Sequence, residues 1–283
     1  MNTSAASFAE LRQIPHWSFS SLNQILNICS MQYAFRKVEQ AEPAFVPGNL
    51  VFGKAFHQSV SHLYRGLQVK GSPLAVPELQ EHFTAALAGQ VKGESLPVHF
   101  GEEKDLDWHL DKGRQMLQSL VDSLDPADEV VGVDVPFIAE FLDEDGRVVS
   151  KPLIGEFDAV VENQGRLVLV DFKTAAAKWP TQKCHSDLQA TAYLMGLRQS
   201  VSSQQSLFRY DVVTKTKEPS VTRYLTDRTD SDFLRLTKLV LMADRVVEQG
   251  LFYPHEGCIA CGGCPYASHC VKWHQQSYLQ LSA

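Results

Sequence analysis

Two aspartates and one lysine interrupt a stretch of sequence that otherwise consists of strand-forming residues. The stretch spans 155–174, GEFDAVVENQGRLVLVDFKT, and its charged residues include Asp158, Asp171 and Lys173. Both halves are rich in Val, Leu and Phe, and the turn-forming segment 163–166 joins them, so the pattern predicts a β-hairpin. Carboxylates in apolar strands of this kind need a chemical reason.

The predicted register of the hairpin brings these charges together. With a two-residue loop at 164–165, Asp158 lies opposite Asp171 and Glu156 opposite Lys173, and all four share one face. Facing Cβ atoms are about 4.5–5.5 Å apart, a range at which like charges repel unless a cation lies between them. The simpler alternative is a pair of edge-strand carboxylates in water. For Glu156 we expect only an ion pair with Lys173.

These residue types suit one kind of chemistry. Carboxylate oxygens are the ligands that Mg²⁺ and Mn²⁺ prefer. Such a cation polarises a phosphate group and activates a water molecule, and the Lys173 ammonium would position that water or offset charge on the phosphoryl oxygens. The pattern is therefore typical of phosphodiester hydrolysis.

Most of the six cysteines lie close together near the C-terminus. The motif CIACGGCPYASHC contains Cys258, Cys261, Cys264 and Cys270. Since a cytoplasmic chain seldom uses disulfides, this density indicates a metal site. The first two gaps, C-x₂-C-x₂-C, match part of a bacterial ferredoxin motif, but the last gap is five residues where that motif has three. A Cys₄ zinc site is the alternative. We expect Cys184 to be a free or buried thiol.

The elements around the hairpin follow from apolar spacing. A first helix is expected from about Ser20 through Cys29 to Tyr33. Further helices are expected at 49–67, 77–90, 107–123, 187–197 and 229–249, with strands at 129–141, 206–213 and 219–225. This order predicts an α/β fold in which helices flank a mixed central sheet with a catalytic hairpin, preceded by a helical N-terminal section.

Composition leaves a nucleic-acid partner possible. The 283 residues are 44% hydrophobic and 21% charged, as in ordinary globular proteins, and the net charge is −7. Residues 101–145 hold 14 acidic and 3 basic residues, so the rest of the chain is net positive; we expect this acidic segment to be a solvated helix and loop that serves solubility. Several basic and aromatic residues are candidates for contacting the phosphates of a nucleic-acid strand or stacking on a base, although we expect most of them to be plain surface charge. They are Lys178, Trp179, Lys183, Arg209, Lys215, Lys217 and Arg223.

No segment approaches the ~20 apolar residues of a membrane span, and the N-terminus lacks the features of a secretory signal. We therefore expect a cytoplasmic protein without a membrane partner.

Taken in order, these motifs resemble the PD-(D/E)XK nuclease superfamily, and within it the RecB-like and CRISPR-adaptation exonuclease branch. GEFD carries Asp158, VDFKT carries Asp171 and Lys173, and QATAY resembles the Gln-x-x-x-Tyr element, with Gln189 and Tyr193. Upstream, GKAFH resembles the helix whose histidine binds the metal, and SSLNQILNICSMQYAFRKV resembles the N-terminal helix that bears one cysteine. The resemblance runs from about residue 18 to 272.

The resemblance implies a restriction-endonuclease-like core with His57, Asp158 and Asp171 as metal ligands. By spacing alone, a lone histidine beside an apolar helix stripe such as His57 is more often a core residue. The resemblance also implies that Gln189 and Tyr193 act in catalysis by holding the substrate or the lysine, although residues one helical turn apart also bond each other. Imidazole suits Mn²⁺ better than Mg²⁺, so we expect higher activity with Mn²⁺.

The same resemblance implies a [4Fe–4S] cluster bound by Cys29, Cys261, Cys264 and Cys270. Cys258 is then surplus, or it replaces Cys29 in a purely local site. The cluster is expected to clasp the two ends of the chain around the nuclease core. The corresponding sections are 1–128 (helical, with the first cysteine and His57), 129–250 (nuclease core) and 251–283 (cysteine-rich, packed on the N-terminal helix).

The expected function is a metal-dependent DNA exonuclease that acts on single-stranded or unwound ends in recombination, repair or antiviral defence. The alternative is a DNA-binding subunit of a larger helicase–nuclease or spacer-acquisition complex, with little activity alone and a helicase or recombination/adaptation protein as partner. A zinc-stabilised interaction protein is a third reading, in which the nuclease motifs are coincidental.

Overall fold

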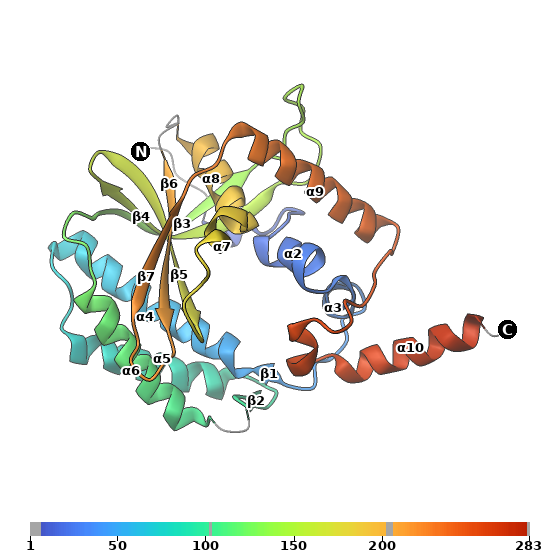
Figure 1. The fold of residues 1–283 in the computed structure, drawn as a ribbon, viewed down its shortest axis with the longest axis horizontal. Helices are drawn as coiled ribbons and strands as arrows, with labels where there is room; N and C mark the ends of the chain where they lie inside the picture. Colours follow the sequence, from blue (N-terminus) through green and yellow to red (C-terminus); the bar gives the residue numbers. More distant parts are fainter. Residues whose placement is uncertain (1–6, 102–103, 202–205, 282–283) are drawn as a thin grey trace.

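The computed structural model describes residues 7–101, 104–201 and 206–281, and a mixed five-stranded sheet lies at its centre (Figure 1). Its strands follow the order of the sequence, and only β5 and β6 are parallel neighbours. The α/β fold with a mixed sheet is thereby confirmed. The strands are β3 (Glu129–Ala139), β4 (Leu153–Asn163), β5 (Arg166–Ala175), β6 (Leu207–Thr214) and β7 (Val221–Thr226).

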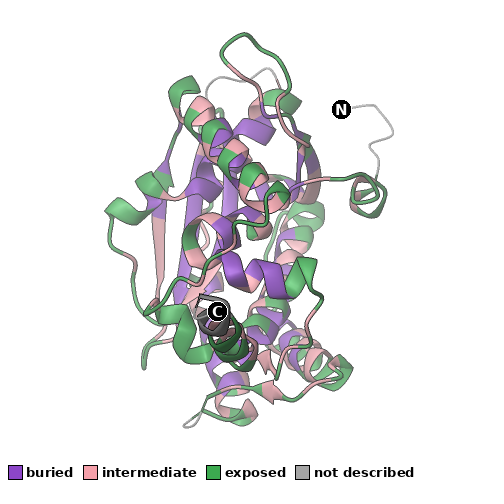
Figure 2. Cartoon of the chain, turned by 90° about the vertical axis from the view of Figure 1, so that its right-hand side faces the viewer, coloured by how far each residue is buried: buried purple, intermediate pink, exposed green. Residues whose placement is uncertain are grey.

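Helices cover both faces of this sheet (Figures 1 and 2). One face packs against α4 (Gly48–Lys70), α5 (Val76–Gly93) and α6 (Leu106–Asp122). The other packs against α2 (Phe19–Asn23), α8 (Leu188–Ser200) and α9 (Asp230–Glu248). Parallel strands need a long crossover, and α7 (Gln182–Ser186) with α8 provides it between β5 and β6. The remaining elements are α1 (Phe8–Leu11), α3 (Ser30–Tyr33), β1 (Val46–Pro47), β2 (Val98–His99), η3 (Ile259–Gly263) and α10 (Ala267–Leu281).

The single N-terminal helix expected from apolar spacing is wrong, because the chain leaves helical geometry at Cys29. The backbone there is extended, with φ −166° and ψ 114°. Two π-helical turns, η1 (Gln24–Ile28) and η2 (Ala34–Val38), follow α2 and α3. Tyr253 supplies a reason for the break, since its carbonyl accepts hydrogen bonds from the Ser30 hydroxyl and the Met31 N–H. The interruption couples this segment to the C-terminal part of the chain.

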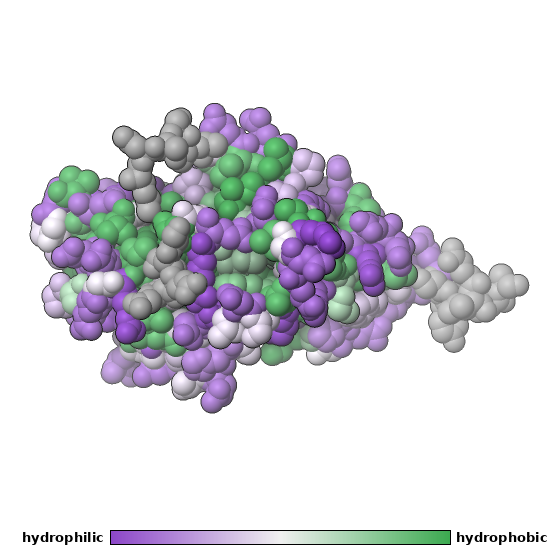
Figure 3. All heavy atoms as spheres, turned by 90° about the horizontal axis from the view of Figure 1, so that it is seen from above, coloured by the Kyte–Doolittle hydropathy of each residue, from purple (hydrophilic) through white to green (hydrophobic). Residues whose placement is uncertain are grey.

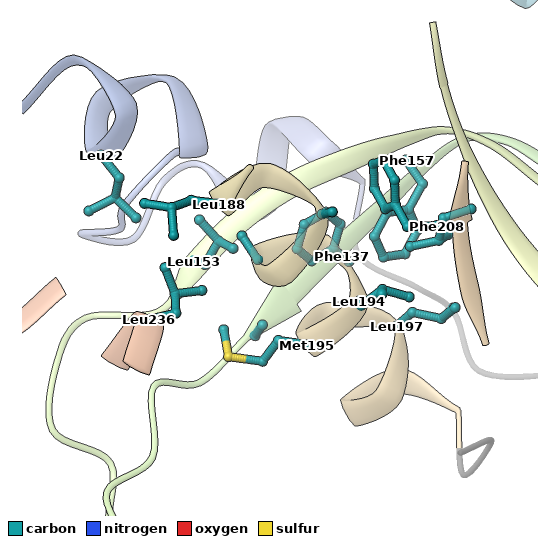
Figure 4. Packing of buried hydrophobic residues seen from close by; sticks show 14 of the residues in the cluster. Leu22, Phe137, Leu153, Phe157, Leu188, Leu194, Met195, Leu197, Phe208 and Leu236 are labelled. Atoms are coloured by element: carbon teal, nitrogen blue, oxygen red, sulfur yellow. The ribbon is translucent and has the colours of Figure 1, made fainter. Parts of the chain in front are cut away.

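The core beneath α8 is built around aromatic side chains of the sheet (Figure 4). The rings of Phe137 on β3 and Phe157 on β4 stack with centroids 4.2 Å apart. Gly155 and Gly196 permit this packing, because a Cβ at either position would come within 3 Å of the Phe137 ring. On the opposite face, Phe52 and Phe56 of α4 and Phe83 of α5 form a second aromatic group.

The predicted hairpin register is confirmed, but it ends just before the two aspartates. Gln164 and Gly165 both have positive φ, as a type I′ turn requires, and the paired positions run from Asn163 and Arg166 to Ala159 and Val170. Asp158 is not part of this ladder. Its carboxylate Oδ2 instead accepts a hydrogen bond of 2.9 Å from the backbone N–H of Phe172. The end of the ladder therefore places an acid side chain between the strands.

A buried ion-pair network corrects two expectations. Arg209, only 3% exposed, contacts Asp128 at 2.7 Å and Asp211 at 2.8 Å. Arg223 approaches Asp211 at 3.4 Å. Two arginines considered for following phosphates thus pair with carboxylates of the protein, Arg209 buried and Arg223 with 28% of its side chain exposed. Asp128 of the acidic segment has a structural role beyond solubility. Cys184 is buried, as expected.

The outer surface mixes hydrophilic and hydrophobic residues, as the view from above illustrates (Figure 3). Within the described ranges, every helix is either too short or too polar to cross a bilayer.

Candidate active site

Asp171 is the most enclosed acid of the hairpin. It is 2% exposed on β5, and its Oδ1 accepts a hydrogen bond of 2.6 Å from the Gln189 side-chain amide on α8. The Lys173 ammonium nitrogen lies 2.7 Å from Oδ2. That oxygen is buried and accepts no hydrogen bond of good geometry among the described residues. Asp171 Oδ2 is therefore held only by its attraction to the charge of the Lys173 ammonium.

The charges around Asp171 shift its pKa and that of Lys173. Burial raises the pKa of Asp171 to about 6, against the opposing effect of Lys173 and with a further increase from Asp158. Burial disfavours the charged form of Lys173, but the carboxylates of Asp171 and Asp158 outweigh it and raise the lysine pKa. The ammonium is thus kept protonated, and 29% of the side chain remains exposed to reach a substrate.

His57 approaches the second acid from α4. Its Nε2 lies 2.7 Å from the Phe172 carbonyl oxygen, and its Nδ1 lies 3.4 Å from Asp158 Oδ2. When Nε2 carries the proton and donates to the carbonyl, the Nδ1 lone pair faces the carboxylate. Two acceptors at this distance are stabilised by a positive charge between them. A histidine that donates one ring N–H to a backbone carbonyl is also the usual arrangement of a metal ligand.

The donor set fits a divalent cation, although its side chains do not form a complete site as they stand. His57, Asp158 and Asp171 offer one imidazole and two carboxylates around Phe172, which Mn²⁺ and Mg²⁺ accept. In the part of the chain that the structure describes, no three His, Cys, Asp or Glu residues are already arranged to hold a metal ion. Asp158 is engaged with Phe172 and Asp171 with Lys173.

Two other predicted contacts turn out differently. The expected ion pair between Glu156 and Lys173 is wrong, because Lys173 pairs with Asp171. Burial, followed by the charges of Asp134 and Asp158, raises the pKa of Glu156.

The structure brings Gln189 to Asp171 and not to the lysine. Tyr193 packs its ring edge-on against Phe137 and Phe157, and burial with the charges of Asp171 and Asp158 raises its pKa.

A hollow of about 690 Å³ opens beside His57 and Asp158, between α4, α5, β3 and β4. Its wall contains an ion pair that sequence reasoning missed, Arg65 on α4 with Asp134 on β3, at 2.5 Å. Asp134 has a φ of +49°, which is unusual for a residue other than glycine. The sequence offered one signal for this pair, because Arg65 follows His57 by eight residues and so lies near the same face of the helix. Its partner on the strand, Asp134, could not be recognised from the sequence.

The cysteines predicted to bind a cluster also come together. Cys29 and the four C-terminal cysteines line a cavity of about 250 Å³ against α3 and α10. Gln32 donates a side-chain hydrogen bond to Cys264 Sγ at 3.3 Å, and the His255 N–H donates to Cys29 Sγ at 3.4 Å. Burial and then the neighbouring thiols Cys29 and Cys264 raise the pKa of Cys270. A metal group would reverse this effect, because a neighbouring metal cation lowers the pKa of a thiol.

Beyond the hairpin, Lys183 Nζ lies 3.8 Å above the Trp179 ring. The ring itself packs against Tyr210 and Tyr224. Their predicted roles in binding nucleic acid stay predictions.

The central hairpin of the mixed sheet ends in two aspartates and a lysine, and a helix that covers the sheet supplies a histidine. This combination is that of an α/β protein of the nuclease type. The chain belongs to the PD-(D/E)XK nuclease superfamily, whose family model matches residues 16–271. Members of this superfamily generally use divalent metal ions.

A solved structure has a similar fold. A crystal structure described as a "Putative exonuclease" from Eubacterium rectale is similar, with a TM-score of 0.56 and 14% identity over 93% of each chain. The crystal structure of SSO0001 matches at 14% identity over 82% of this chain and 91% of that chain, but its TM-score of 0.34 is too low to support an inference. No curated protein matches the sequence.

Proposed function

We propose that this protein is a metal-dependent DNA exonuclease of the RecB-like branch, acting on single-stranded or unwound ends. The observation that carries the proposal is the buried Asp171, held between Gln189 and the protonated Lys173 at the end of the hairpin. A module that only binds DNA has no need of a lysine in that position. The similarity to a structure described as an exonuclease supports the proposal at the level of fold.

His57, Asp158 and Asp171 would hold the catalytic cation. When bound, Mn²⁺ or Mg²⁺ would supply Lewis acidity toward the phosphate and lower the pKa of a water molecule. Lys173 would hold that water in line with the phosphorus atom or offset the charge that develops on the phosphoryl oxygens. Gln189 would keep Asp171 in its orientation through the 2.6 Å hydrogen bond. Tyr193, packed edge-on against the stacked rings of Phe137 and Phe157, would fix the position of this helix against the sheet.

The C-terminal section is proposed to bind a [4Fe–4S] cluster through Cys29, Cys261, Cys264 and Cys270. A Cys₄ zinc site is the alternative, and among the described residues no three thiols are already arranged to hold either metal group. A cavity of about 250 Å³ with N–H donors directed at two sulfurs suits a larger cluster. Its role would be structural, because Met31, Phe35 and Tyr266 already pack the two ends of the chain together there.

The direct test is degradation of labelled linear and circular DNA by anaerobically purified protein with Mn²⁺, next to a Lys173→Ala variant. Loss of label from linear DNA that depends on Lys173 supports the nuclease. A folded, metal-loaded protein without activity would instead favour a DNA-binding subunit of a helicase–nuclease or spacer-acquisition assembly.

A further inference from the structure

The hollow beside the candidate active site carries a cation that the proposed chemistry does not use. His57 and Asp158 line one part of it, and Arg65 lines another. Arg65 follows His57 by eight residues on α4, which places it about 12 Å further along the helix axis. A group bound at Arg65 is therefore distinct from a group bound at His57 and Asp158.

Arg65 is held in place and remains accessible. Its Nη2 lies 2.5 Å from Asp134 Oδ2, while the Ser61 hydroxyl donates a hydrogen bond of 2.8 Å to Asp134 Oδ1. More than half of the arginine side chain, 56%, is exposed. An arginine fixed by one carboxylate keeps further N–H donors for a second anion, because the guanidinium group carries five of them.

The backbone of Asp134 supports a functional reading of this pair. A φ of +49° is uncommon in a non-glycine residue, although aspartate adopts it more readily than most, and such conformations cluster at functional sites. Asp134 lies on β3 between Val133 and Val135, which pair with Ala159 and Phe157 on either side of Asp158. The strained residue is thus directly beside the candidate catalytic acid.

The chemistry of the hollow restricts where an anion binds. Asp134, Glu156 and Asp158 contribute carboxylates to its wall, and His62 and His82 stack against each other at 4.5 Å. Arg65 is the permanently charged cation among the described residues that line it. A phosphate group in this hollow would therefore bind at the arginine.

We propose that Arg65 binds a phosphate of the substrate strand other than the one that is cleaved, and that Asp134 orients it for this contact. Arg65 is then a substrate-positioning residue, and the hollow between α4, α5, β3 and β4 is the path of the strand as it leaves the catalytic acids. This inference rests on the proposed nuclease function and adds to it the binding site of the flanking phosphate.

The test is steady-state cleavage of a labelled single-stranded oligonucleotide with Mn²⁺, over a series of salt concentrations, for wild type and Arg65→Gln. Loss of a hydrogen-bonded charge contact should raise KM about tenfold or more, with little change in kcat if the contact is equal in ground and transition states. The dependence of log(kcat/KM) on log salt should become shallower by about 0.7, the value for one phosphate contact on a single strand.

Three further variants separate phosphate binding from a structural role. Arg65→Lys keeps a positive charge and should restore the salt slope. Asp134→Asn breaks the ion pair but leaves the arginine charge, and asparagine tolerates positive φ, so its KM should stay well below that of Arg65→Gln. Arg114→Gln removes an arginine from an exposed ion pair with Asp111 on α6, and should behave as wild type.

Each result has one meaning. An active wild type whose KM and salt slope are unchanged in Arg65→Gln overturns this inference and leaves the nuclease intact. A KM increase of equal size in Arg65→Gln and Asp134→Asn, with the wild-type salt slope in both, also overturns it, because the ion pair and not the arginine charge would then be responsible. A wild type that cleaves no DNA overturns the proposed function itself.

Discussion

The side-chain amide of Gln189 donates a hydrogen bond of 2.6 Å to Oδ1 of Asp171, and so connects helix α8 to the strand that carries the buried acid. The contact explains why a polar residue lies on the buried side of α8. It also fixes one oxygen of the acid while the other faces Lys173.

Gln189→Leu should weaken cation binding and shift its pH dependence. A hydrogen bond to a carboxylate favours the charged form, so its loss raises the pKa of Asp171 above its value of about 6. Asp171 is ionised above its pKa, and cation binding is lost as the pH falls through it. In the variant this loss should therefore occur at higher pH. Calorimetric titration with Mn²⁺ between about pH 5 and 8 measures the shift.

The control for this variant is Gln199→Leu, on the same helix, where the amide contacts the backbone of Glu140. Identical Mn²⁺ binding curves for wild type and Gln189→Leu would show that the hydrogen bond does not tune the acid.

His57→Ala should remove a preference for Mn²⁺. Imidazole suits Mn²⁺ better than Mg²⁺, so we expect wild type to cleave faster with Mn²⁺ and the variant to bind Mn²⁺ at least about tenfold more weakly. Rates at saturating Mn²⁺ and Mg²⁺ give the comparison, with His62→Ala on the same helix as the control. Equal or faster cleavage by wild type in Mg²⁺ would argue against His57 as a direct ligand.

Cys29→Ser should lose the proposed cluster, whereas Cys258→Ser should retain it. Both sulfurs line the same cavity, and Cys258 Sγ lies 3.6 Å from Cys261 Sγ, so proximity alone does not separate them. Iron and sulfide content with the visible absorption spectrum of anaerobically purified variants decides between them. The reverse result would assign the fourth ligand to Cys258, and zinc in place of iron would rule out the cluster.

Arg209→Met should destabilise the fold by about 3–5 kcal/mol, because it leaves Asp211 and Asp128 as buried charges without their shared partner. The free energy of unfolding in urea measures this effect. Arg147→Met is a matched control, since Arg147 pairs with Asp145 at the surface and its loss should change stability by less than about 1 kcal/mol. A small effect for Arg209→Met would mean that its ion pairs contribute little.

The sequence predicted those parts of the protein that depend on local pattern. The turn at Gln164 and Gly165 determines the register of the hairpin, because strand pairing follows directly from loop length. Helical spacing likewise located α4, while it was the resemblance to the nuclease superfamily that singled out His57, whose Nδ1 lies 3.4 Å from Asp158 Oδ2. Chemistry carried by one short segment was therefore accessible from its order of residues.

Features that depend on distant partners were not predictable in this way. The break at Cys29 follows from hydrogen bonds to Tyr253, more than two hundred residues later, which helical propensity does not register. Arg209 looked like a surface charge because Asp128 belongs to another element. The Arg65 and Asp134 pair depends on how β3 packs under α4.

The most direct test of the central claim is the loss of end label from single-stranded, double-stranded and circular DNA with Mn²⁺, for wild type and Lys173→Ala. Wild type should degrade linear DNA and spare closed circles, and the variant should be at least about a hundredfold slower, since it lacks the charge beside the phosphoryl group. Equal rates for the two proteins, or intact DNA in the presence of folded and metal-loaded wild type, would contradict the assignment of Asp158, Asp171 and Lys173 as a nuclease site.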